Sequence, residues 1–230
     1  DMYAAVEKAG YKHIEMAPGD THNGAIETAD EGRVYAKWLK DHEGEYDGII
    51  ICLPNFGDEN GAVPAMRDAT VPILIQAYPD EIGMMDFEHR RDSYCGKFSI
   101  SDMFNQFGIK YTLLPPHVVH PSSDAFQQNL HDFAAVCRVV KANRRFTIGG
   151  IGARTTAFKT VRWDEVTLQK YGITFESYDL SELFSRMRAM KDGRSDLKDK
   201  MEALKQYSDF TKCPAEHFSW LAKMSVAIDD

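Results

Sequence analysis

Short apolar runs alternate with helical patterns along most of the chain. The run at 48–53 is continuously apolar and bounded by turn residues, which is typical of a parallel strand covered on both faces. The run at 71–76 has the same character, and its early Pro72 is tolerated at a strand start. Further strands are predicted at 11–17, 145–148 and 173–178.

Helices are predicted between and after these strands, from apolar residues spaced three and four apart. Thr28 is a candidate N-cap for the helix at 28–42, and Gly108 ends the helix at 98–107. The remaining helical patterns lie at 2–9, around 65–69 and at 124–142, 164–170, 180–190, 196–207 and 214–228. Strands that alternate with helices predict parallel sheets with right-handed crossovers. The expected fold is α/β, with two flavodoxin- or Rossmann-like parallel-sheet units in tandem and a helical C-terminal tail.

The change of unit is placed after residue 144. An N-terminal α/β domain is expected at 1–144, and the start of a second α/β domain at 145–230. The chain begins at Asp1 inside a helical pattern and ends at Asp230 directly after an amphipathic run. We interpret it as a fragment of a longer polypeptide, in which the first domain lacks its first strand and the second is truncated.

Charge and cysteine usage narrow the class of protein. The 27 Lys and Arg against 35 Asp and Glu give a net charge of −8, which argues against a broad nucleic-acid or anionic-membrane surface. No apolar run approaches the roughly 18 to 20 residues that span a bilayer. The four cysteines are far apart without CxxC spacing, so no structural zinc site is expected. Cys52 and Cys137 lie in apolar runs and are predicted to be buried thiols, and this usage fits a reducing cytoplasm.

A glycine-rich stretch at 148–160 is predicted to form a turn from a strand to a helix. Gly149, Gly150 and Gly152 allow a tight turn and a close approach to a ligand. Arg154 and Thr155 then offer hydrogen-bond donors. The stretch contains neither GxGxxG nor GxxxxGK[ST], which leaves a nucleotide site weakly supported. A plain glycine-rich turn with a surface arginine explains it equally well.

Two further clusters are candidates for the wall of a ligand crevice. Asn55 and Phe56 follow the buried run at 48–53, where open α/β sheets bind ligands, although a polar turn with an aromatic lid is an equal alternative. Tyr94, Cys95 and Lys97 precede the helix at 98–107. Cys95 would be a nucleophile only with a stabilised thiolate, and no His or Asp partner lies nearby in sequence. We therefore expect Cys95 to be a buried small residue and Lys97 to be solvated.

Several stretches resemble the L-fucose isomerase-like family, which is related to L-fucose and L-arabinose isomerases. The most specific is Gly152-Ala153-Arg154-Thr155-Thr156-Ala157-Phe158-Lys159-Thr160. It lies within a matched stretch at 151–162, and the others run from 47 to 59, from 94 to 99 and from 171 to 183. The resemblance covers about residues 10–190 and includes less of the helical tail.

The resemblance implies a metal-dependent aldose–ketose isomerase, usually with manganese or a similar divalent ion. It also implies a trimer or hexamer in which the N-terminal domain helps to wall a neighbour's site. It places the metal ligands and the acid/base carboxylate beyond the matched part, so no catalytic or metal residue is assigned to this chain. The sugar-facing wall implied here comprises Asn55, Phe56, Tyr94, Cys95, Lys97, Arg154 and Thr155.

Two interpretations of the function stay open. In the first, the chain is part of a sugar isomerase and is inactive by itself. In the second, it is a non-catalytic α/β module that binds sugars. In both cases the expected partner is a small sugar, without nucleic acid or membrane.

Overall fold

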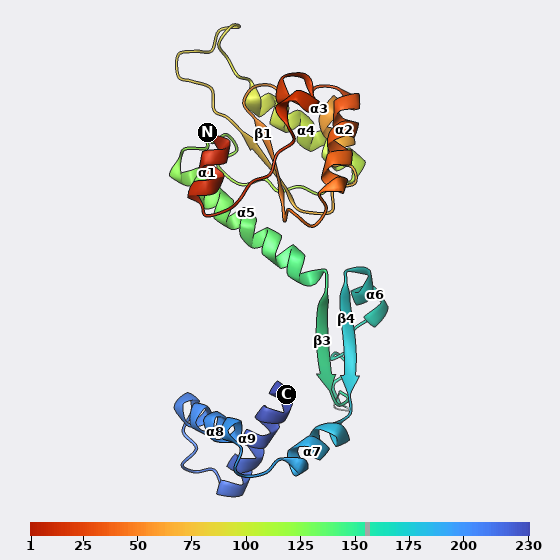
Figure 1. The fold of residues 1–230 in the computed structure, drawn as a ribbon, viewed down its shortest axis with the longest axis vertical. Coiled ribbons are helices and arrows are strands. Elements are labelled where there is room, and N and C mark those ends of the chain that lie inside the picture. Colours follow the sequence, from red (N-terminus) through yellow and green to blue (C-terminus); the bar gives the residue numbers. More distant parts are fainter. Residues whose placement is uncertain (155–156) are drawn as a thin grey trace. The chain divides into compact units, whose positions relative to one another are not determined.

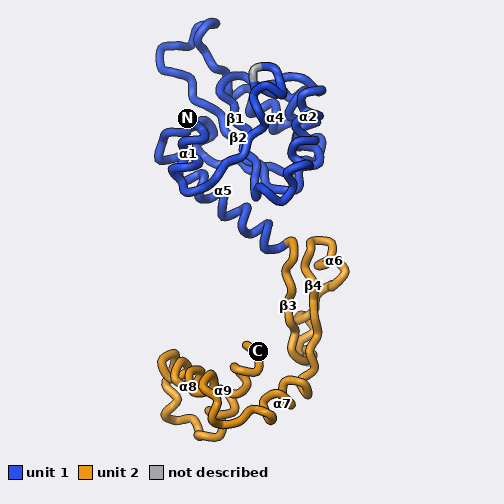
Figure 2. The backbone as a smooth tube through the Cα atoms, viewed as in Figure 1, with its two compact units in different colours: residues 1–143 blue, residues 144–230 orange. Residues whose placement is uncertain are grey.

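The computed structural model describes residues 1–154 and 157–230, which form two compact units. Unit 1 spans Asp1–Asn143 and unit 2 spans Arg144–Asp230 (Figure 2). Each unit contains a small parallel sheet, and unit 2 ends in helices (Figure 1). The α/β fold with two parallel sheets and a helical C-terminal region is therefore confirmed.

The sheet of unit 1 pairs β1 (Ile49–Leu53) with β2 (Ile73–Ala77) in parallel, in the register that sets Ile49 beside Ile73. Thr112 adds an isolated parallel bridge to Leu74 on the far side of β2. Every residue of β2 is buried. The two continuous apolar runs of the sequence thus form strands that are enclosed by the rest of the unit.

Helices cover both faces of this sheet (Figure 1). One face packs on α2 (Ala29–Asp41), α3 (Glu59–Met66) and α4 (Ser93–Phe107). The other packs on α1 (Met2–Lys8) and α5 (Asp124–Asn143). Along β2, Ile73 and Ile75 belong to the first core cluster and Leu74 to the second, because successive side chains of a strand point to opposite faces.

Local signals position two of these helices. The Thr28 hydroxyl accepts a hydrogen bond from the Glu31 backbone N–H at 3.2 Å, and the Glu31 carboxylate accepts one from the Thr28 N–H at 2.9 Å. This capping box confirms Thr28 as the N-cap of α2. Gly108 ends α4 with φ of 70°, in the left-handed region that favours glycine.

The predicted strand at 11–17 is wrong. These residues form no ladder, and the chain continues into the short 3-10 turns η1 (Pro18–Asp20) and η2 (His22–Gly24). Their alternating pattern is real, since Tyr11 and His13 are half-buried between exposed neighbours. Alternation alone does not supply the backbone partner that a strand requires, and β2 already bonds β1 and Thr112.

Unit 2 pairs β3 (Phe146–Ile151) with β4 (Ile173–Tyr178) in parallel. The short helix α6 (Glu165–Lys170) connects these strands. The chain then continues through α7 (Leu180–Ala189), α8 (Ser195–Tyr207) and α9 (Ala215–Asp229). The last three helices share a core that includes Leu183, Met187, Leu197, Ala222 and Val226. No helix among residues 1–154 and 157–230 is long and apolar enough to cross a membrane.

The glycine-rich stretch differs from its prediction as a direct strand-to-helix turn. Gly149 and Gly150 lie inside β3, and α6 begins only at Glu165. A Cβ on Gly150 would lie 2.2 Å from the Phe175 ring of β4, so this glycine is needed for close packing inside the sheet. Gly152, with φ of 74°, is the glycine whose backbone conformation begins the turn.

Candidate functional site

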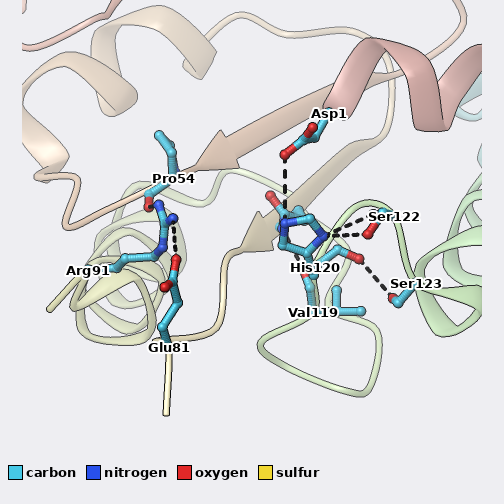
Figure 3. Close-up of polar contacts among 9 residues, drawn as sticks. Asp1, Pro54, Glu81, Arg91, Val119, His120, Ser122 and Ser123 are labelled. Carbon is cyan, nitrogen blue, oxygen red and sulfur yellow. Dashed lines mark hydrogen bonds and ion pairs between the residues drawn. The ribbon is translucent and has the colours of Figure 1, made fainter. Parts of the chain in front are cut away.

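The candidate site lies at the carboxyl ends of β1 and β2. The loop that follows β1 is joined to the segment preceding α4, because the Phe56 N–H donates to the Arg91 carbonyl oxygen at 2.6 Å. In return, the Arg91 guanidinium donates to the Pro54 carbonyl oxygen at 2.9 Å and lies 3.4 Å from the Glu81 carboxylate (Figure 3). Two loops more than thirty residues apart in the sequence therefore share one edge of the sheet.

A glycine contact brings α4 onto the same edge. A Cβ on Gly96 would lie 2.6 Å from the backbone nitrogen of Gly57 and 2.7 Å from its oxygen. Only a residue without a side chain permits this approach. The contact places the first turn of α4, with Tyr94, beside the loop that carries Asn55 and Phe56. All three of these side chains are exposed.

Cys95 and Lys97 have the opposite environments to those expected. Cys95 is exposed, whereas Lys97 is only 4% exposed. The reason is the rotation of α4: Ser93 and Lys97 are four residues apart, so they share the helix face that packs inward. Burial lowers the pKa of the Lys97 ammonium to about 8.

Lys97 and Gln76 both hold the segment 117–119. The Lys97 ammonium donates to the His117 carbonyl oxygen at 2.8 Å, and the Gln76 side-chain amide donates to the Val119 carbonyl oxygen at 2.7 Å. The Val119 N–H in turn bonds the last carbonyl of β2, at Ala77. The Oε1 atom of Gln76 and the Oγ of Ser93 are buried without a hydrogen-bond partner among the described residues. The floor of this edge is therefore polar.

Tyr78 and His120 belong to the site but are absent from the predicted residues. Their rings meet edge to face with centroids 5.1 Å apart, and the Arg91 guanidinium lies 5.4 Å from the centre of the Tyr78 ring. Burial and the nearby Cys52 thiol raise the pKa of Tyr78, while Arg91 opposes the shift. Tyr78 directly follows the buried strand β2. The sequence could have indicated it by the same signal that indicated Asn55, which is a position at the end of a buried strand. No comparable signal marks His120, which lies 42 positions further along.

Hydrogen bonds define the tautomer of His120. The Ser122 backbone N–H donates to Nδ1 at 3.2 Å, so Nδ1 is an acceptor and the ring proton lies on Nε2. Nε2 faces the Asp1 carboxylate at 3.7 Å (Figure 3). The edge thus offers an amide, a phenol, an imidazole and a guanidinium beside aromatic faces. This combination suits a neutral ligand that is rich in hydroxyl groups.

The two remaining predicted residues do not belong to unit 1. Arg154 is half-buried in unit 2, on the loop that follows β3. Thr155 lies outside the described residues. The structure therefore gathers Asn55, Phe56 and the first turn of α4 at one edge, and the grouping of Arg154 and Thr155 with them stays a prediction.

Residues 1–154 and 157–230 contain no group of three or more His, Cys, Asp or Glu side chains that could hold a metal ion. The described side chains therefore do not by themselves fit a complete manganese centre. The chemistry that they support is recognition of a ligand through hydrogen bonds and ring contacts.

Comparison with known proteins identifies the matched family. Residues 1–144 match the family model described as the fucose/sulfoquinovose isomerase N-terminal domain. A search of curated proteins gave no match to the chain.

Proposed function

Because the chain belongs to the fucose/sulfoquinovose isomerase family, we propose that it supplies a sugar-binding wall of an aldose–ketose isomerase. The observation that supports this most directly is the ring contact between Tyr78 and His120 at the edge beyond β1 and β2, where the Phe56 loop bonds Arg91 and the first turn of α4, with Tyr94, packs on Gly57. Exposed rings stack on the apolar face of a sugar, and the polar groups beside them bond its hydroxyls.

The proposal assigns the metal to other residues. Manganese, or a similar divalent ion, would be held outside the side chains described above, since these form no suitable cluster. Arg154 and Thr155 are proposed as a further part of the sugar wall. We also propose that the protein works in the cytoplasm as a homo-oligomer, a trimer or a hexamer. Its four free cysteines fit a reducing compartment.

Sugar titration by calorimetry tests the binding role. The 230-residue chain is titrated with L-fucose, L-arabinose and sulfoquinovose, with and without manganese. Tyr94→Ala is expected to weaken binding about tenfold or more, because a stacked ring and its hydroxyl are removed. Tyr207→Ala is the matched control, since Tyr207 is an exposed tyrosine on α8 of unit 2. Absence of binding to all three sugars, or equal binding by both variants, would contradict the proposal.

A second candidate function is a sugar-binding module without catalysis, which the ring contact of Tyr78 with His120 and the hydrogen-bonding groups of the same edge also support. The two functions differ in turnover. Ketose formation from any of these sugars in the presence of manganese supports the isomerase, whereas tight metal-independent binding with no turnover supports the module.

A further inference from the structure

Unit 1 presents an apolar arm that its own chain does not cover. The arm, residues 80–92, connects β2 to α4 and projects from the unit as the yellow loop in Figure 1. Ile82 is fully exposed, Phe87 is 88% exposed and Met85 is 62% exposed. Apolar side chains grouped in this way on a soluble unit mark an interaction site.

The arm is ordered at its base. The Asp80 carboxylate accepts hydrogen bonds from the backbone N–H groups of Arg91 at 2.6 Å and Asp92 at 3.3 Å, which closes the loop. The Arg91 side chain ties the same base to Pro54 and Glu81 (Figure 3). Further turns bond Met84 to Glu81 and Arg90 to Asp86. An arm held in this way loses less conformational entropy on binding than a free loop does.

The same unit carries a groove of about 450 Å³ between α2, α3 and α4. Its lining is mixed: the apolar residues include Ala36, Val63, Pro64, Met103 and Phe107, and the polar ones are Arg33, Glu59, Asn60, Arg67 and Asp68. Phe107 is half-exposed, so an apolar surface is open there. The full exposure of Ile82 means that the arm does not fill the groove of its own chain.

The charges of the arm and of the groove rim are complementary. At the rim, the Arg67 guanidinium lies 5.2 Å from the centre of the Phe107 ring, beside the exposed Asp68. On the arm, Glu88 and Arg90 follow the apolar tip, and the Arg90 guanidinium lies 5.8 Å from the centre of the Phe87 ring and 3.8 Å from the Asp92 carboxylate. Glu88 can therefore pair with Arg67, and Arg90 with Asp68, when the apolar tip enters the groove.

We propose that the arm of one copy of this chain docks in the α2–α3–α4 groove of a second copy. The contact is head to tail, because the arm and the groove are different surfaces of one unit, and its repetition gives a ring where the rotation between copies closes. Its apolar tip would lie in the groove and its charged flanks on the rim. The residues of the arm that would enter the contact, Ile82, Phe87, Glu88 and Arg90, are not among those assigned to the sugar edge, although Arg91 at the base of the arm belongs to that edge.

Sedimentation of the full chain tests this contact. The arm variant Ile82→Ser/Phe87→Ser and the groove variant Ala36→Arg are each expected to raise the dissociation constant of the assembly at least about tenfold. Val139→Ser, a matched change of an exposed apolar residue on α5, is expected to leave the assembly unchanged. Circular dichroism and thermal unfolding show whether each variant is folded. If Ala36→Arg does not fold, Arg67→Glu replaces it as the groove variant, with Glu88→Arg as its expected rescue.

Mixing the two defective chains gives a sharper test. At a concentration below the raised dissociation constant each variant is mainly monomeric alone. The groove variant keeps an intact arm and the arm variant keeps an intact groove, so an equimolar mixture at that concentration is expected to form a heterodimer. A wild-type chain that is monomeric at all concentrations would overturn the proposal. So would arm and groove variants that assemble like the wild type, or a mixture that stays monomeric.

Discussion

The buried Lys97 ammonium donates a hydrogen bond to the His117 carbonyl oxygen at 2.8 Å. A charged helix residue thus holds the backbone segment that leads to His120. Lysine is seldom buried to this extent, because its charge loses hydration. The contact therefore links the stability of unit 1 to the geometry of the candidate site.

The first prediction concerns the pH dependence of stability. Burial lowers the pKa of Lys97 from 10.5 to about 8, so between these values the unfolded chain holds a proton that the folded chain has lost. The contribution of Lys97 to the free energy of unfolding therefore rises between about pH 8 and pH 10.5, by about 3 kcal/mol at most. Urea unfolding of wild type and Lys97→Met over this range should show a difference in slope. Cysteines and tyrosines also ionise in this range, but both proteins contain the same ones, so their contribution is removed when the two curves are subtracted. Curves of unfolding free energy against pH that run parallel for the two proteins would contradict the lowered pKa of Lys97.

The second prediction concerns the glycine contact that positions α4. Gly96→Ala places a methyl group against the Gly57 backbone and should destabilise the protein by about 1–3 kcal/mol, because neither backbone can easily move. It should also weaken sugar binding by moving the first turn of α4, with Tyr94, away from the loop that carries Phe56. Gly19→Ala is the control, since a Cβ there meets nothing within 4 Å. Equal unfolding midpoints in urea for the two variants would show that the contact is not tight.

The third prediction concerns the start of α2. Hydrogen bonds from the backbone N–H groups of His22, Glu27 and Thr28 lower the pKa of Glu31 to about 2. The stabilising effect is therefore complete above about pH 4.5 and is lost as the pH falls toward 2. Glu31→Gln should lower the urea midpoint of unfolding at neutral pH. The midpoint of this variant should also fall less than that of the wild type as the pH is lowered below about 4.5. A carboxyl titration by NMR that gives Glu31 an ordinary pKa would refute this.

The fourth prediction compares two adjacent glycines in β3. Gly150→Ala would place its Cβ 2.2 Å from the Phe175 ring, which itself packs against Trp163 with centroids 4.6 Å apart. Gly149→Ala meets only Tyr178, at an ordinary 3.7 Å. We expect Gly150→Ala to change the Trp163 fluorescence and lower the melting temperature of unit 2, and Gly149→Ala to do neither. Identical effects of both changes would mean that strand propensity, and not the ring contact, accounts for them.

The fifth prediction concerns thiol reactivity. Cys95 is exposed, whereas burial raises the pKa of both Cys52 and Cys137 to about 11. Because the thiolate is the reactive form, Cys95 should be alkylated well before these two in the native protein. Peptide mass mapping after timed labelling measures the order, and denatured protein supplies the control in which the differences vanish. Labelling of Cys137 as early as Cys95 would contradict the prediction, and would indicate that α5 separates from the sheet in the native protein.

The sequence by itself determined the elements whose signals are local. The apolar runs specified β1 and β2, the Thr28 and Glu31 pair specified the start of α2, and Gly108 specified the end of α4. Position after a buried strand also predicted that Asn55 and Phe56 face a ligand, and this role stays a prediction. Each of these depends on hydrogen bonds or burial within a few residues, which composition and spacing encode directly.

Only the tertiary structure decided which side of α4 faces the core, and this reversed the expected environments of Cys95 and Lys97. It also joined Tyr78 to His120, and it gave Gly150 a packing role against Phe175 on the neighbouring strand. The physical reason is common to these cases. The contacts join residues that are distant in sequence, and their free energy depends on how helices and strands pack, which no local pattern records.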